Sequence, residues 1–158
     1  MFEPHHYLKL PRMVAATYYV GAVDGEPVCH IAFAPRLEIG AMRACRMVVL
    51  PEWQGAGIGV RFLNALCQRS VDGLGPFGKR AANAVYFHTS HPGLCEALRR
   101  DRKWLQCSQA MFGGNRGKSI RSINRSAKKN IAKNKCGAPG VAGYGGHFRA
   151  VQGFKYIG

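Results

Sequence analysis

A glycine-rich turn between a strand-like and a helix-like segment constrains this chain more than any other feature. The turn runs from Gln54 to Gly59 and contains three glycines. An apolar segment, 42–50, precedes it and is closed by Pro51, and apolar residues recur at helical spacing after it. At such a junction glycine lets the backbone approach a ligand, and the first N–H groups of the helix lack helical partners. The sequence therefore predicts a cradle for an anion.

Two common phosphate-binding motifs do not fit this turn. A P-loop requires Gly-Lys-Ser/Thr, and a dinucleotide fingerprint requires Gly-x-Gly-x-x-Gly with an acidic residue about 20 positions on. The turn instead resembles the acetyl-CoA motif of the GNAT acetyltransferases, Gln/Arg-x-x-Gly-x-Gly/Ala, with Gln54, Gly57 and Gly59 in its fixed places. The preceding residues 48–53 are typical of that family's fourth strand and its exit.

The resemblance implies an α/β (α+β) fold: a mixed, mostly antiparallel sheet with a central V-shaped splay, flanked by helices. It also implies acetyl-CoA as co-substrate, with transfer of the acetyl group to an amine by direct attack on the thioester. We expect no metal, because His88, His91 and Cys95 have a faint ligand spacing but no fourth ligand is near them. Backbone groups of Met47, Val48 and Val49 would pair with the pantetheine arm. The pyrophosphate would lie on the backbone amides of Gln54, Gly55, Ala56, Gly57, Ile58, Gly59 and Val60.

The order of predicted elements matches the GNAT core from its second strand onward. A helix follows the glycine turn, and a second runs from Pro92 to about Arg100 with His91 as its cap. The family's first strand and helices are reduced to residues 1–11, which leaves the wall of the acceptor site undefined. Residues 5–8, 89–92 and 154–158 are also similar to a GNAT subgroup with members fused to ATPase domains. Strands are expected at 18–23, 27–34, 42–50, 82–90, 104–112 and 148–157, with a hairpin turn at 24–25.

A proton acceptor for the amine is the least defined part of the site. The strand at 42–50 has no carboxylate, which leaves Glu38 before it and Glu52 after it. His88 is our candidate, because imidazole titrates near neutrality, although a strand histidine is more often structural. The tyrosine that usually serves as general acid is missing near Leu98, and Ser90 is a candidate substitute. His91 and Cys95 are further candidates, Cys95 being equally suited to core packing, or the thiolate leaves without an acid.

Positive charge is concentrated in the last third of the chain. All eight acidic residues lie within 1–101, whereas 12 of the 23 basic residues lie within 102–158. Glycines bracket an insertion at about 113–146, and its stretch 116–135 holds eight basic residues and no acidic one. This stretch predicts contact with nucleic acid, an acidic protein or a membrane surface; a solvated basic loop is the alternative.

Length and composition favour one domain, 1–158, in the cytoplasm. No apolar run reaches the ~20 residues of a membrane span, and the six cysteines show no CxxC pairing. We expect an N-acetyltransferase that acts on a small-molecule or protein amine, and we leave a homodimer open. Few carboxylates are available for a strongly cationic acceptor. The alternative is a non-catalytic GNAT module that binds CoA or nucleic acid.

Overall fold

The computed structural model describes residues 1–5, 13, 15–75, 84–109 and 150–158. Two compact units are distinguished, Met1–Ser108 together with Gln152–Gly158, and Gln109–Val151. Apart from Gln109, every helix and strand below belongs to the first unit. In chain order these elements are η1 (Glu3–His5), β1 (Thr17–Val23), β2 (Glu26–Arg36), η2 (Leu37–Ile39), β3 (Ala41–Val49), η3 (Pro51–Trp53), α1 (Ile58–Val71), β4 (Val85–Thr89), α2 (Pro92–Arg100), β5 (Trp104–Gln109) and β6 (Gln152–Tyr156).

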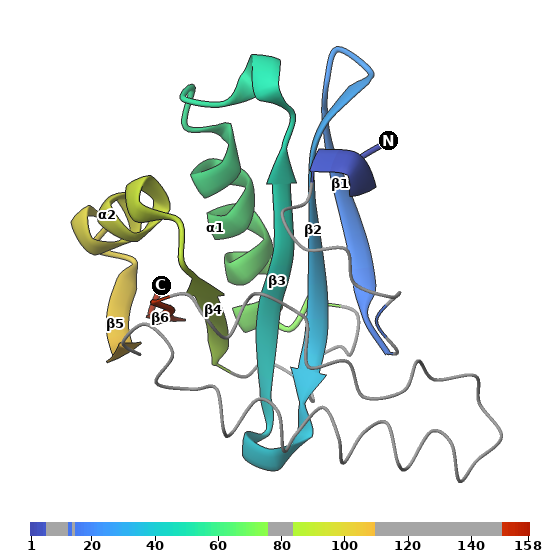
Figure 1. Ribbon diagram of the computed structural model, residues 1–158. Coiled ribbons are helices and arrows are strands. Elements are labelled where there is room, and N and C mark those ends of the chain that lie inside the picture. The colour runs from blue at the N-terminus through green and yellow to red at the C-terminus, as the bar shows by residue number, and fades with distance from the viewer. Residues whose placement is uncertain (6–12, 14, 76–83, 110–149) are drawn as a thin grey trace, which may run out of the picture. The chain divides into compact units, whose positions relative to one another are not determined.

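The strands form one six-stranded sheet in the order β1-β2-β3-β4-β6-β5 (Figure 1). The β1–β2, β2–β3 and β4–β6 pairs are antiparallel, and β3 runs parallel to β4. Asp24 and Gly25 both have positive φ, of 50° and 85°, as a two-residue hairpin of the primed type requires. The predicted mixed, mostly antiparallel sheet is confirmed.

Both α-helices pack on the same face of the sheet. The apolar spacing of α1 buries Leu63 and Cys67, and α2 buries Leu98, all in one core cluster with the strand residues Phe33 and Phe87. Each large apolar side chain buried in this way contributes roughly 1.5–3 kcal/mol to folding. The opposite face of the central strands is where the pocket described below is found.

The parallel pairing of β3 with β4 is short. It extends from Met42, opposite Val85, to Ala44, opposite Phe87, whereas β3 itself continues to Val49. The two strands therefore separate after Ala44, and among the strands of the described residues none pairs with this side of β3 beyond that point. This separation is the predicted V-shaped splay.

Element ends differ from the prediction mainly near the residues that the structure leaves undescribed. The strand expected at 82–90 is Val85–Thr89, and the one expected at 148–157 is Gln152–Tyr156. The strand from Trp104 is described to Gln109, and the insertion at 113–146, with its basic stretch 116–135, lies outside the described residues. None of the helices in the described part of the chain is long and apolar enough to cross a membrane.

Candidate active site

The glycine turn connects the end of β3 to the start of α1, as the sequence predicts. After the single turn of η3, Gly55 and Gly57 adopt positive φ values of 85° and 74°, and α1 begins at Ile58. Gly57 occupies the N-cap position and no side chain caps the helix, so the first N–H groups of α1 face outward without a side-chain acceptor. Gln54 Nε2 donates to the Val49 carbonyl over 2.9 Å and holds the turn to the strand end.

The three glycines of this turn have different structural roles. A Cβ on Gly55 or Gly57 would meet no heavy atom within 4 Å, so both face open space and are needed for their backbone conformation. A Cβ on Gly59 would lie 2.9 Å from Val49 Cγ2 and 3.4 Å from Met47 Cε. Gly59 therefore allows α1 to approach β3 closely, and a bulky residue there would disturb packing. A substitution of Gly59 would therefore change helix packing as well as any anion binding by the turn, although the motif includes this residue.

A β-bulge interrupts β3 beside the splay. The β2–β3 register shifts between His30 and Ala32, and Arg46 of β3 has a φ of 52°. The Arg46 carbonyl oxygen lies 3.2 Å from His30 Nδ1, and the His30 ring also stacks on Tyr18, with centroids 5.6 Å apart. His30 therefore has a structural role at the bulge.

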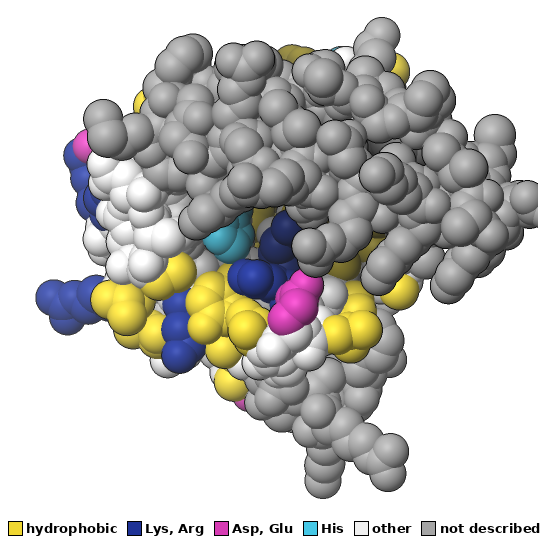
Figure 2. All heavy atoms as spheres, turned by 60° about the horizontal axis from the view of Figure 1, so that its bottom comes forward, with side chains coloured by type: hydrophobic (Ala, Val, Ile, Leu, Met, Phe, Trp, Pro, Cys, Tyr) yellow, Lys and Arg dark blue, Asp and Glu magenta, His cyan; other side chains and the backbone are white. Residues whose placement is uncertain are grey.

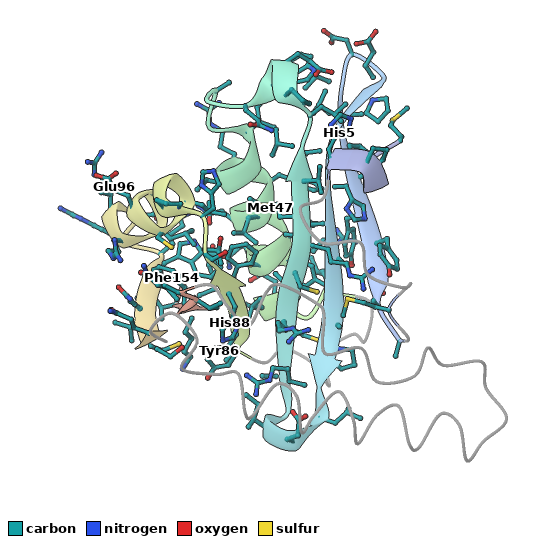
Figure 3. All side chains as sticks on the ribbon, in the orientation of Figure 1. His5, Met47, Tyr86, His88, Glu96 and Phe154 are labelled. Carbon is teal, nitrogen blue, oxygen red and sulfur yellow. The ribbon has the colours of Figure 1, made fainter. Side chains whose placement is uncertain are left out.

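The bulge changes which side chains of β3 face α1. Regular alternation from the core residue Ala44 would direct Arg46 and Val48 toward the helix, but the extra residue directs Met47 and Val49 there instead. Figure 3 shows Met47 between β3 and α1. The backbone of residues 47–49 lies beyond the point where β3 and β4 stop pairing, so it borders the splay.

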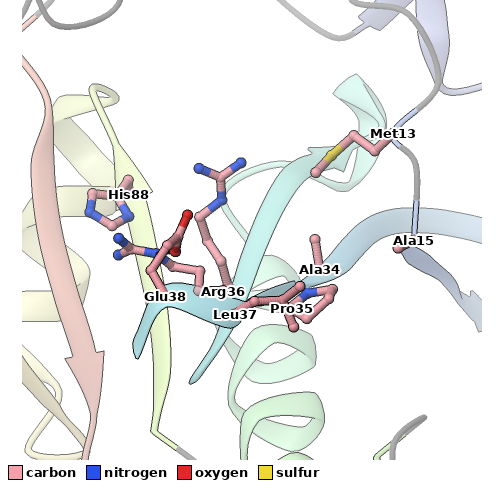
Figure 4. Close-up of a pocket in the computed structure, with 9 residues that line it drawn as sticks. Met13, Ala15, Ala34, Pro35, Arg36, Leu37, Glu38 and His88 are labelled. Carbon is pink, nitrogen blue, oxygen red and sulfur yellow. Dashed lines mark ion pairs between the residues drawn. The ribbon is translucent and has the colours of Figure 1, made fainter. Parts of the chain in front are cut away.

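A pocket of about 540 Å³ lies at the other end of β3. It is lined by residues 34–38 at the end of β2 and in η2, by Arg43 of β3 and by His88 of β4 (Figure 4). Met13 and Ala15 complete the described lining. Figure 2 shows this hollow, with basic, acidic and histidine side chains gathered among hydrophobic ones.

His88 lies on the face of β4 opposite the helices. Its neighbours Phe87 and Thr89 are buried, whereas His88 keeps an exposed edge. Partial burial of the ring, followed by the positive charges of Arg43 and Arg36, lowers the pKa of His88 from its ordinary value of 6.5. The neutral imidazole therefore dominates at pH 7 and can accept a proton.

Two residues that the sequence did not single out adjoin His88. Gly153 of β6 pairs with His88 across the sheet, and a Cβ there would overlap Ser108 Oγ and lie 3.0 Å from His88 Nε2. The Ser108 hydroxyl and the imidazole thus flank the Gly153 backbone. Because 88, 108 and 153 are distant in the sequence, strand pairing alone brings them together.

Of the other candidate residues, Glu38 lines the pocket and the rest do not. Glu52 is exposed in η3, beside the glycine turn, and Ser90 lies past the end of β4. His91 Nδ1 accepts a hydrogen bond of 3.2 Å from the Leu94 N–H, so this side chain caps α2 as predicted. Cys95 is in the core, and Leu98, where a general-acid tyrosine was sought, is fully buried.

Metal ligands are not grouped anywhere among the described residues. His88, His91 and Cys95 have a faint ligand spacing in the sequence, but the first lines the pocket, the second caps a helix and the third is buried in the core. The cysteines that the structure describes are all free thiols: Cys29, Cys45, Cys67, Cys95 and Cys107.

Arg36 and Arg43 are the pocket residues that the sequence reasoning missed. A signal was present, because Arg43 alternates with the apolar Met42 and Ala44 and must therefore point away from the core face. Nothing in the sequence, however, indicates that Arg36 and His88 meet it there.

No protein-family model matches the sequence, and no curated protein matches it either. Solved structures do resemble the fold. A chimera of the Vibrio cholerae spermidine N-acetyltransferase SpeG and hSSAT is 10% identical, with a TM-score of 0.56 over 90% of this chain and 68% of that chain. A ribosomal-protein-alanine N-acetyltransferase from Brucella melitensis is 13% identical, with a TM-score of 0.54 over 89% and 67%.

A third structure connects the fold with its ligand. It is a GNAT family acetyltransferase from Elizabethkingia anophelis with acetyl-CoA bound, 11% identical, with a TM-score of 0.53 over 90% of this chain and 76% of that chain. All three similarities are to acetyltransferases, and at these identities they concern the fold. The fold of this chain is the GNAT acetyltransferase fold.

Proposed function

We propose that this protein is an acetyl-CoA-dependent N-acetyltransferase whose cofactor pyrophosphate binds the backbone amides of residues 54–60. The observation that carries the proposal is the uncapped start of α1, with open space over Gly55 and Gly57, at the end of a strand that separates from its parallel neighbour after Ala44. Amides at a helix start bind phosphate groups well, because the helix dipole adds to their hydrogen bonds. The fold likeness to a structure with acetyl-CoA bound supports the same assignment.

The distance between the cradle and the pocket suits the length of this ligand. Val49 adjoins Gly59 of α1, and Ala44 pairs with Phe87, next to His88. The five residue steps from Ala44 to Val49 span roughly 16 Å at about 3.3 Å per residue. An extended pantetheine arm that follows this span from the cradle would bring its thioester past the bulge at Arg46, toward the pocket.

Each group then has a defined task in acetyl transfer. Backbone N–H groups of Met47–Val49 hold the arm and polarise the thioester carbonyl. Neutral His88 takes the proton that the ammonium form of the acceptor must lose before the amine attacks. The C–N bond forms, the C–S bond breaks, and CoA leaves as a thiolate, which is stable enough to depart without a tyrosine.

A pair of matched glycine variants tests the cradle. Gly57 and Gly25 both have positive φ, of 74° and 85°, and neither has a heavy atom within 4 Å of an added Cβ. Gly57→Leu should weaken acetyl-CoA binding by at least tenfold in calorimetry, because the loss of charge-assisted hydrogen bonds costs ~1.5–3 kcal/mol each. Gly25→Leu should carry the same backbone strain and leave the affinity unchanged. Full acetyl-CoA affinity in a folded Gly57→Leu variant would show that the cradle is elsewhere.

A non-catalytic CoA-binding module is the second candidate. It is favoured by the fully buried Leu98 at the place of the family's usual general-acid tyrosine, and by the exposure of Glu52 away from the pocket. Thiol release from acetyl-CoA with pooled amines separates the two functions. Release with any amine supports the enzyme, whereas acetyl-CoA binding without release from any pool supports the module.

We also keep nucleic acid as a proposed partner of the basic stretch 116–135, on charge alone. Each phosphate that a basic side chain neutralises should steepen the log-affinity against log-salt slope by nearly one unit. Binding of RNA or DNA that is lost on deletion of 116–135, with acetyl-CoA affinity retained, would support the partner. No salt-sensitive binding by the intact chain would remove it.

A further inference from the structure

We infer that the amine acceptor also carries an oxyanion, a carboxylate or a phosphate, which Arg36 and Arg43 bind while the amine faces His88. This inference rests on the proposed acetyl transfer, because it treats the pocket at His88 as the acceptor site. It adds the chemical class of the acceptor, which the fold leaves open.

The charges of the pocket carry the inference. Arg36 and Arg43 line it with one carboxylate, that of Glu38, and the other described lining residues are His88 and apolar residues. With His88 neutral, two guanidinium groups face a single carboxylate. The described lining therefore has an excess of one positive charge.

Glu38 does little to neutralise this excess. Its carboxylate lies 3.8 Å from Arg36 Nε, and its side chain is 78% exposed, against 36% for Arg36. An ion pair in contact with so much water is weak and holds its partner loosely. An incoming oxyanion can displace or share this contact, because a guanidinium presents five donors in a fork that fits carboxylate and phosphate groups.

The apolar walls strengthen this preference. Met13, Ala34 and Pro35 form apolar parts of the pocket lining, and charge interactions beside them are stronger than at an open surface. An oxyanion would therefore be attracted and a second ammonium group repelled. This argues against a polyamine acceptor, although one protein with a similar fold is named for spermidine.

The position of the arginines limits the size of the acceptor. Both guanidinium groups act on the His88 ring, so an oxyanion bound by them lies near the imidazole that would receive the amine proton. The volume of about 540 Å³ is in the range of small-molecule sites. A small amine with its oxyanion a few bonds away fits this arrangement.

Affinity measurements on matched amines test the inference. We would titrate the full chain, alone and with CoA, with β-alanine against β-alaninamide, and with phosphoethanolamine against ethanolamine. The oxyanion should improve affinity about tenfold, since hydrogen bonds to charged groups contribute at least 1.5 kcal/mol. The two pairs distinguish carboxylate from phosphate. Putrescine, a diamine without an oxyanion, serves as a further probe. The inference would be overturned by equal affinities within both pairs, by tighter binding of putrescine than of both oxyanion probes, or by no binding of any probe.

Two charge variants locate the contact. Arg36→Gln and Arg43→Gln should each reduce the preference for the oxyanion by at least threefold, while Arg102→Gln, an exposed arginine between α2 and β5, should keep it. Circular dichroism confirms that each variant is folded. A preference that survives in the double variant, or that is equally lost in Arg102→Gln, would show that the pocket arginines do not bind the oxyanion.

A proton measurement separates this inference from the proposed function. An oxyanion between Arg36 and Arg43, with Glu38 nearby, offsets the charges that lower the pKa of His88, so binding should raise it. The shift is measured by NMR, with His88→Gln to assign the signal, and needs no turnover. Oxyanion preference without acetyl-CoA binding would refute only the proposed function, whereas acetyl-CoA binding at the cradle without the preference would refute only this inference.

Discussion

The imidazole of His88 is placed where two positive charges oppose its protonation. Burial lowers its pKa below 6.5, and Arg43 and Arg36 lower it further. The folded protein therefore binds this proton less readily than the unfolded chain. The linked penalty on folding appears as the pH falls below 6.5 and is complete below the folded pKa. At neutral pH the penalty is absent, because the imidazole is neutral in both the folded and the unfolded chain.

The acid limb of the rate profile should report this pKa. We expect its midpoint below 6.5 for the wild-type protein and a shift upward in Arg43→Gln, because one opposing charge is removed. The measurement is a pH–rate profile on an accepted amine, with Arg102→Gln as the control. His88→Gln should lose activity by roughly 10²-fold or more if His88 is the base. An unchanged acid limb in His88→Gln would remove this residue from the mechanism.

Gly153 controls the space around the same imidazole. A methyl group there would overlap Ser108 Oγ and crowd His88 Nε2, so Gly153→Ala must displace one or both side chains. We expect at least a tenfold loss of rate with unchanged acetyl-CoA affinity, because displacement by about an ångström in an active site is costly.

A second substitution checks the cause. Ser108→Ala in the Gly153→Ala background removes the overlapping hydroxyl and should restore part of the rate, as measured by thiol release. If the single and double variants are equally impaired, the displaced group is the imidazole alone. If Gly153→Ala is fully active, the position of His88 does not matter for catalysis.

At the scale of elements, each helix of the described chain begins in a way that fits its role. Helix α1 has no side-chain cap, in keeping with the proposed pyrophosphate site at its first amides, whereas α2 is capped by His91, with Pro92 at its first position. The same backbone groups are thus open at the cradle and satisfied at the structural helix.

The α2 cap leads to a stability prediction. His91→Ala should lower the free energy of unfolding by about 1 kcal/mol, because the Leu94 N–H loses its acceptor, whereas His91→Asn should retain most of it. Urea unfolding monitored by circular dichroism measures both. His5→Ala, in the exposed η1, serves as the control. Equal stability of His91→Ala and wild type would mean that the cap hydrogen bond is replaced by water at no cost.

At the scale of the whole first unit, a hydrogen-bonded chain ties α1 to the sheet. Asn64 Oδ1 accepts from the buried Trp104 indole over 2.7 Å, and Asn64 Nδ2 donates to Asp101 Oδ2 over 2.7 Å. One turn further along α1, Gln68 Oε1 accepts from the Tyr156 hydroxyl over 2.9 Å. These amides look like part of a solvated helix face in the sequence, yet they satisfy buried aromatic donors.

Asn64→Ala should therefore destabilise the protein well beyond an ordinary surface change. It leaves the Trp104 N–H buried without its acceptor, which costs about 1–3 kcal/mol. Thermal and urea unfolding measure the loss, and Ala65→Ser on the exposed side of α1 is the control. In a Trp104→Phe background the same substitution should cost much less, and an undiminished cost there would assign the effect to Asp101 instead.

Local chemistry explains what the sequence by itself determined. The glycine turn, the start of α1, the Asp24–Gly25 hairpin and the cap and proline of α2 depend on residues a few positions apart. Their backbone preferences and hydrogen-bond partners can therefore be predicted from the sequence. Strand order and the mixed sheet came from the resemblance to GNAT proteins, which the same short motif carried.

Only the tertiary structure decided the composition of the pocket. His88 meets Arg43 because β3 and β4 pair in parallel, and it meets Ser108 and Gly153 because β6 lies between β4 and β5. The bulge at Arg46 reverses the faces of the following residues, and a shift by one residue is invisible to a pattern of period two. Contacts between distant segments depend on register and strand order, which no short stretch of sequence encodes.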